Sequence, residues 1–170
     1  MDQYVQLAHK TLEMYLKENK IPEAVNAFAD ITNKRAGCFV SIHTKNGNLR
    51  GCIGTILPTH KNLAGEIISN TIAAAQNDSR FPKVEAKELE NLIISVDVLS
   101  TPELVESEKD LDAKKYGLIV RTEDSREGLL LPDIKGVDSV LDQIKIAKEK
   151  GGIGIDEPIS LFRFTTTRHE

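Results

Sequence analysis

The chain has 170 residues, of which 40% are hydrophobic and 28% are charged, proportions typical of a folded globular domain rather than of a disordered chain. Its 22 basic and 26 acidic residues give a net charge of −4, and aromatic residues make up only 5%, which argues against a nucleic-acid-binding surface. Neither a secretory leader nor a run of about 18 apolar residues is visible, so we expect a cytoplasmic protein without a membrane span.

The first half of the chain predicts helices on either side of a β-hairpin. Apolar residues recur at helical spacing over 3–18, with Asp2 as N-cap and Asn19 as the stop, and a shorter helical segment follows over 22–29. Residues 37–55 read as two strands around a turn. A wide apolar stripe over 60–76 predicts a central helix, for which Thr59 is a suitable N-cap.

The second half adds strands and one helix. The predicted elements are a central strand over 92–99, a turn or short helix over 103–112, a hairpin over 117–132, a helix over 138–150 and a closing strand over 158–167, placed at an edge or beside the first hairpin. Strands in hairpins without a βαβ rhythm favour the α+β class. We therefore expect one domain over residues 1–170, with a mainly antiparallel or mixed sheet and flanking helices.

The first hairpin carries the most specific pattern in the chain. Asn46-Gly47 favours a two-residue type I′ turn, because both central residues of that turn take positive φ. This turn would fix the register so that Ser41 faces Cys52 and His43 faces Arg50. The two faces of the hairpin then differ in character.

Apolar side chains gather on one face of the predicted hairpin and polar ones on the other. The first face carries Cys38, Val40, Ile42, Leu49 and Ile53, and the second carries Phe39, Ser41, His43, Arg50 and Cys52. Since the two cysteines lie on opposite faces, we expect both to be free thiols. The polar face is the candidate site, with its side chains within cross-strand reach of one another.

Cys52 supports two interpretations. A thiolate stabilised by Arg50 and His43 would be a nucleophile or a metal ligand, whereas a free cysteine is also commonly a small buried hydrophobic residue. Arg50 suits a carboxylate or phosphate, and His43 suits a base, but an uncovered sheet face would favour solvated surface residues instead. If Arg50 lines a binding cleft, replacing it by Ala should remove binding and change stability by no more than about 0.5 kcal/mol.

The remaining patterns argue against bound metals and nucleotides. The histidines at 9, 43, 60 and 169 show none of the spacings of zinc sites. Gly151-Gly152-Ile153-Gly154 follows a helix instead of opening one, so it lacks the geometry of a phosphate-binding loop. We expect no metal and no cofactor.

Three segments together resemble the AMMECR1-domain family. Leu49-Arg50-Gly51-Cys52-Ile53-Gly54 matches its LRGCIG signature, Asp78-Ser79-Arg80-Phe81-Pro82 is similar to its DPRFP segment with Ser79 in place of the first proline, and Leu161-Phe162-Arg163-Phe164 is a matching closing segment. The resemblance implies a single α+β domain in which the signature lines a cleft, with Asp78 and Arg80 nearby.

Two functional classes follow from these residues. In the first, the chain is an accessory or partner-binding module; the resemblance implies Memo-like and radical-SAM proteins as partners. In the second, it is an enzyme that uses Cys52 as nucleophile or thiolate ligand on a small anionic substrate. The lack of a complete acid–base set around Cys52 favours the binding module.

Overall fold

The computed structural model describes residues 2–23 and 29–170. The chain forms two compact units, one built from residues up to Leu99 together with Thr167–Glu170, and the other from Ser100–Thr166. Each unit contains a four-stranded sheet with antiparallel pairing and its own buried hydrophobic cluster. The predicted α+β class with antiparallel sheets and flanking helices is therefore confirmed, while a single domain over residues 1–170 stays a prediction.

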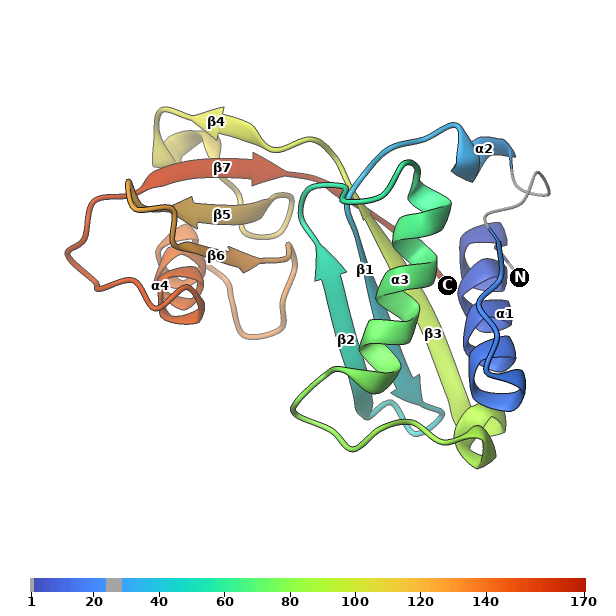
Figure 1. Ribbon diagram of the computed structural model, residues 1–170. Coiled ribbons are helices and arrows are strands. Elements are labelled where there is room, and N and C mark those ends of the chain that lie inside the picture. The colour runs from blue at the N-terminus through green and yellow to red at the C-terminus, as the bar shows by residue number, and fades with distance from the viewer. Residues whose placement is uncertain (1, 24–28) are drawn as a thin grey trace. The chain divides into compact units, whose positions relative to one another are not determined.

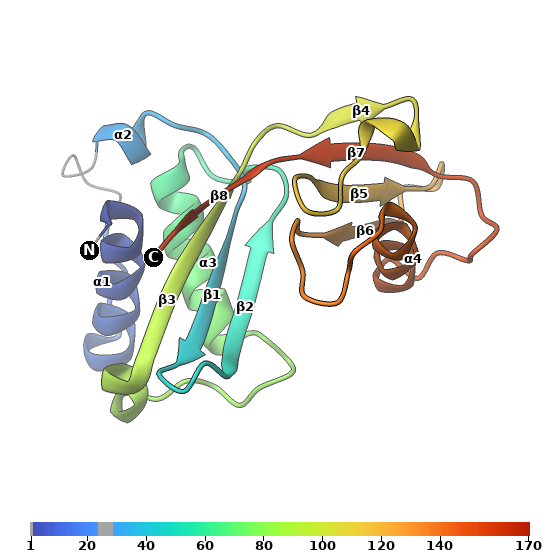
Figure 2. The ribbon, with the colours of Figure 1, turned by 180° about the vertical axis from the view of Figure 1, so that it is seen from behind.

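The first unit is a sheet with two long helices on one side. Its strands run in the order β2-β1-β3-β8, and α1 and α3 both cover the same face, so the opposite face carries no helix among the described residues (Figures 1 and 2). The elements are α1 (Gln3–Glu18), α2 (Ala29–Thr32), β1 (Cys38–Thr44), β2 (Leu49–Thr55), α3 (Leu63–Gln76), the 3-10 helix η1 (Ala86–Asn91), β3 (Leu92–Leu99) and β8 (Thr166–His169).

The core of this unit lies between the sheet and its helices. The predicted alternation along β3 is confirmed, since Leu92, Ile94, Val96 and Val98 belong to the hydrophobic core, whereas the residues between them do not. The four core residues pack with the apolar residues of β1 and with the inward rows of α1 and α3. A side chain that points away from this core must lie on the helix-free face of the sheet.

The helix boundaries follow their caps. Asp2 accepts a hydrogen bond from the Tyr4 N–H and Asn19 closes α1 in the left-handed region, both as predicted. The central helix starts later than predicted, because the Asn62 side chain caps it by accepting from the Gly65 N–H, while Thr59 bonds elsewhere. Most of the short helix predicted over 22–29 falls outside the described residues.

The hairpin turn differs from the prediction. Its loop has three residues, Lys45 to Gly47: Thr44 pairs with Asn48 through a 2.9 Å hydrogen bond, and the Gly47 N–H donates to the Thr44 carbonyl at 2.8 Å. Gly47 has a φ of +84°, and Asn46 is not in the positive-φ region. The two-residue type I′ turn is therefore wrong; the loop is the three-residue kind that ends in one left-handed glycine.

A bulge in β2 restores the predicted register beyond the turn. His43 pairs with Leu49 rather than with Arg50, the pairing shifts between Ile42 and His43, and Ser41 then faces Cys52 as predicted. The longer loop displaces the pairing by one residue, and the extra residue Arg50 displaces it back. The two irregularities thus cancel before the candidate site.

The second unit has its own sheet and helix. Strand order is β4-β7-β5-β6, and α4 packs on β5 and β6. Its elements are β4 (Glu103–Val105), the 3-10 helix η2 (Glu108–Asp110), β5 (Gly117–Arg121), β6 (Glu127–Leu130), α4 (Val140–Lys150) and β7 (Ser160–Phe164). The second hairpin and the last helix are confirmed.

The closing strand is divided between the two sheets. β7 lies inside the second sheet, between β4 and β5, and β8 lies beside β3 in the first. The predicted position at an edge is correct for β8 and wrong for β7. In the part of the chain that the structure describes, neither strand pairs with the first hairpin. No helix in the described part of the chain combines the length and the apolar character that crossing a membrane requires.

Candidate functional site

Cys52 and Ser41 form a cross-strand pair on the helix-free face of the first sheet. The Ser41 hydroxyl donates to the Cys52 sulfur at 3.2 Å. Ser41 is buried, whereas Cys52 is partly exposed. Cys38 lies on the opposite face, where it is fully buried, and both thiols are free, as predicted.

The loop after α3 closes the outer edge of β2 at Cys52. The Asp78 carboxylate accepts from the Cys52 N–H at 2.9 Å, and Arg80 Nη2 donates to the Cys52 carbonyl at 3.4 Å. Arg80 also donates to both oxygens of Asp78, at 2.9 and 2.7 Å. The hydrogen bond from Arg80 lowers the pKa of Asp78 more than burial raises it. Asp78 and Arg80 thus lie beside Cys52, where the family resemblance implied them.

Arg50, by contrast, is bound to the chain itself. Its guanidinium donates to both carboxylate oxygens of Glu88, at 2.9 and 3.0 Å, and to the carbonyls of Pro82 and Lys83, at 2.7 and 3.2 Å. Its side chain is only 12% exposed. The bulge at Arg50 thus supplies a side chain that fastens the loop between α3 and β3 to the edge strand, and the expectation of a solvated surface arginine is wrong.

His43 lies nearer the turn than the predicted site requires. It is paired with Leu49 and Ile93, and it is partly exposed. Within the described residues, no hydrogen bond joins it to Cys52 or Ser41. A role for His43 as a base toward Cys52 stays a prediction that these contacts do not support.

The sequence interpretation missed three residues of the polar surface that includes Cys52, namely Ser95, Asp97 and Arg168. Asp97 on β3 is almost fully buried and binds Arg168 of β8 through two hydrogen bonds, at 2.9 and 3.0 Å. The signal was present in the alternation of β3, which places Ser95 and Asp97 opposite its apolar residues. We call the surface formed by Ser41, Cys52, Ser95, Asp97 and Arg168 the Cys52 face.

The Asp78–Arg80 pair at the edge of β2 and the Asp97–Arg168 pair on β3 and β8 share one feature: the carboxylate is buried and the arginine is exposed. The carboxylates are buried, with side-chain exposures of 5% for Asp78 and 3% for Asp97, while Arg80 and Arg168 are each 57% exposed. Both arginines have raised pKa values, chiefly through the hydrogen bonds to their carboxylates, with a smaller contribution from Cys52. The groups that this surface exposes to solvent are therefore the guanidiniums of Arg80 and Arg168 and the partly exposed thiol of Cys52.

A second polar cluster, also missed, lies at the start of α3. Glu66 is fully buried and accepts from the Thr55 hydroxyl at 2.5 Å, from the N–H and hydroxyl of Thr59 at 3.0 Å each, and from the N–H and Nδ1 of His60 at 2.8 and 3.2 Å. Burial raises the pKa of Glu66, but these hydrogen bonds outweigh it and lower the pKa. Asn70, one turn along α3, is also buried and donates to the Thr55 hydroxyl at 3.1 Å. Two polar residues four positions apart within the apolar stripe of the helix were the signal available in the sequence.

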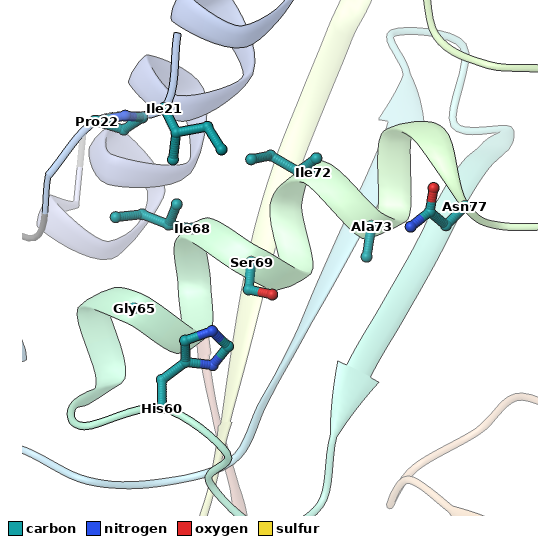
Figure 3. A pocket seen from close by; sticks show the side chains of 9 residues that line it. All are labelled: Ile21, Pro22, His60, Gly65, Ile68, Ser69, Ile72, Ala73 and Asn77. Atoms are coloured by element: carbon teal, nitrogen blue, oxygen red, sulfur yellow. The ribbon is translucent and has the colours of Figure 1, made fainter.

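The first unit has a pocket on α3, away from the hairpin that carries Cys52. It has a volume of about 480 Å³ and lies on the outer side of α3, next to His60 (Figure 3). The second unit has a pocket of about 260 Å³ lined mainly by charged residues that pair with one another. The cleft that the resemblance implied beside the signature stays a prediction.

Comparison with known proteins places the chain in one family. The AMMECR1 family model matches residues 5–169. A protein from Thermotoga maritima is 47% identical over 169 residues, covering 98% of this chain and 97% of that protein. A protein from Clostridium acetobutylicum is 44% identical over 99% of this chain, but the chain spans only 36% of that relative's length.

A solved structure agrees with the fold. The crystal structure of an uncharacterised protein from Pyrococcus horikoshii has a TM-score of 0.88 and 30% identity, and the match covers 97% of this chain and 88% of that one. The family model that matches residues 5–169 and the relative that is 47% identical over 98% of this chain agree, and the chain belongs to the AMMECR1 family.

Proposed function

We propose that this protein is an accessory module that binds an acidic group of a partner protein through the Cys52 face and Arg80. The observation that carries the proposal is the shared orientation of the two ion pairs, in which buried carboxylates hold exposed guanidiniums: Arg80 is at Cys52, and Arg168 lies on β8, with β1 and β3 between it and the strand of Cys52. A fixed guanidinium binds a carboxylate with little loss of side-chain entropy. An acidic side chain or a C-terminal carboxylate of a partner has the chemistry that this surface would recognise.

Two further observations support a binding module over an enzyme. Around Cys52, the described carboxylates are already paired with arginines, so neither Asp78 nor Asp97 is available as a base without breaking an ion pair. The Clostridium relative carries the homologous segment within a chain almost three times as long. The candidate partners are the Memo-like and radical-SAM proteins that the family resemblance implies.

The test is binding of a Memo-like and a radical-SAM protein from the same organism, measured by calorimetry. Arg80→Gln and Arg168→Gln should each weaken binding about tenfold, the scale of one lost charged hydrogen bond. Cys52→Ser should leave the affinity within twofold. Arg121→Gln is the control, because Arg121 is an ion-paired surface arginine of the second unit. Affinities that are equal for the wild type and both arginine variants would contradict the proposal.

The alternative is an enzyme in which Cys52 attacks a small anionic substrate. The Ser41 hydroxyl directed at the sulfur is the observation that favours it, since a donor at 3.2 Å stabilises a thiolate. Iodoacetamide labelling at neutral pH separates the two functions. Alkylation of Cys52 much faster than that of a free thiol in a peptide, abolished by Arg80→Gln, would favour the enzyme. Burial raises the pKa of Cys38 to about 12, so Cys38 should stay unlabelled in either case.

A further inference from the structure

The pocket on α3 combines apolar walls with few polar groups. Its apolar lining comes from one face of α3 and from the segment that follows α1, and Figure 3 shows the His60 ring at its lower end, beside Gly65 and below Ser69. We call it the His60 pocket. It is lined by Ile21, Pro22, His60, Gly65, Ile68, Ser69, Ile72, Ala73 and Asn77. A volume of about 480 Å³ lies within the range of small-molecule sites.

His60 is held in one place and one orientation. Its backbone N–H and its Nδ1 both meet the same oxygen of Glu66, at 2.8 and 3.2 Å. The ring lies directly on α3, because a Cβ at Gly65 would be 3.1 Å from the His60 Cβ. A larger residue at position 65 would therefore push the imidazole away from the helix.

The hydrogen-bond partner of Nδ1 determines the tautomer of the His60 ring, and the tautomer determines whether Nε2 can accept a hydrogen bond. Glu66 accepts four hydrogen bonds from hydroxyl and backbone N–H donors and has a lowered pKa, so it is a carboxylate. Because the Thr59 hydroxyl donates to Glu66, and a carboxylate oxygen lies 3.2 Å from Nδ1, the Nδ1 atom is the nitrogen that carries a proton toward Glu66 or toward Thr59 Oγ1 at 3.1 Å. In the neutral ring, Nε2 is then an acceptor. No described residue donates to Nε2, and the His60 side chain is 43% exposed.

We propose that the His60 pocket binds a small molecule with an apolar body and one hydroxyl or amine group, which donates a hydrogen bond to His60 Nε2. The apolar walls select the body, and the unpartnered acceptor selects a donor. Glu66 lies behind the imidazole, and no lysine or arginine lines the pocket among the described residues. A carboxylate ligand would therefore meet an acceptor and a like charge without a cation to balance it. This site lies on the helix side of the sheet and is independent of the Cys52 face.

Three probes with the same ring test the head-group preference. Benzyl alcohol, benzylamine and benzoate are titrated separately into the full chain, and the methyl resonances of Ile68 and Ile72 are followed by NMR. We expect saturable shifts with the alcohol and the amine, and at least fivefold weaker binding of benzoate. Long-range ¹H–¹⁵N spectra of the imidazole should show the proton on Nδ1, and benzyl alcohol should shift Nε2.

The matched variant is His60→Asn, because an asparagine amide reproduces the Nδ1 donor to Glu66 but has no group in the place of Nε2. It should unfold like the wild type and bind benzyl alcohol about fivefold more weakly, the scale of one neutral hydrogen bond. Ile72→Trp should fill the pocket and remove binding of all three probes. Cys52→Ser should have no effect.

Either of two results would overturn the proposal. One is the absence of saturable shifts at Ile68 and Ile72 in the wild type. The other is equal affinity for benzoate and benzyl alcohol, or equal affinity of the wild type and a folded His60→Asn for the alcohol.

Discussion

The Cys52 face and the His60 pocket lie on opposite sides of the same sheet and use buried carboxylates in different ways. Asp78 and Asp97 each bind a guanidinium that has further donors to present to solvent. Glu66 instead binds hydroxyls, backbone N–H groups and one imidazole, and none of its donors in the described residues is a lysine or an arginine. The first arrangement exposes cationic donors, and the second exposes one ring nitrogen, Nε2 of His60, to which no described residue donates. The partner of a buried carboxylate therefore sets which ligand the surface suits.

The largest effect should follow from removing the Glu66 carboxylate. Glu66→Leu leaves the N–H groups of Thr59 and His60 and the Thr55 hydroxyl without their acceptor. Each of these donors that stays buried and unsatisfied destabilises the fold by about 1–3 kcal/mol. Since part of the loop can reach water, we expect a loss of about 4 kcal/mol in urea unfolding. Glu66→Gln keeps one acceptor oxygen and should lose about half as much. A loss below about 1 kcal/mol for Glu66→Leu would show that the loop does not depend on this residue.

Arg50 should matter for stability more than a surface arginine does. Arg50→Ala removes a two-bond ion pair to Glu88 and two hydrogen bonds to backbone carbonyls, and we expect a loss of about 2 kcal/mol, since the side chain is largely buried. The control Arg121→Ala removes an exposed ion pair and should lose about 0.5 kcal/mol. If both variants lost the same free energy of unfolding, Arg50 would contribute no more than an ordinary surface arginine.

The ion pair at Cys52 predicts a specific loss of stability in acid. Asp78 has a folded-state pKa below its ordinary 3.8, so its contribution is present above about pH 4 and is lost as the pH falls through 3.8 toward the folded-state pKa. Between pH 6 and pH 3, the free energy of unfolding measured in urea should therefore fall by about 1 kcal/mol less in Asp78→Asn than in the wild type. Glu66 also has a lowered pKa and contributes a similar slope in both proteins, so the difference isolates Asp78.

The sequence predicted the parts of the site that depend on strand alternation. Ser41 opposite Cys52, the opposite positions of the two thiols and the buried face of β3 all follow from a side-chain period of two. The loop after α3 was placed by family resemblance alone. These features depend on short-range geometry or on a motif.

The parts that were missed depend on contacts between distant segments. Arg168 reaches Asp97 across 71 positions in the sequence, and Glu66 gathers donors from a loop whose path no periodic pattern describes. The turn was wrong for a different reason: Asn-Gly suits both a two-residue and a three-residue loop, and the bulge at Arg50 allows the longer loop without moving Cys52. Register at the site was therefore predictable even though the turn was not.

The smallest effects test that turn. Gly47 has a φ of +84° with nothing within 4 Å of an added Cβ, so Gly47→Ala should lose about 1 kcal/mol from backbone strain alone. Asn46 has no positive φ, so Asn46→Ala should change the free energy of unfolding by no more than a few tenths of a kcal/mol. A type I′ turn would instead make both substitutions costly, because it places both residues in the left-handed region. Urea unfolding of the two variants distinguishes the loops, and a cost near 1 kcal/mol at Asn46 would contradict the three-residue loop and with it the need for the bulge at Arg50.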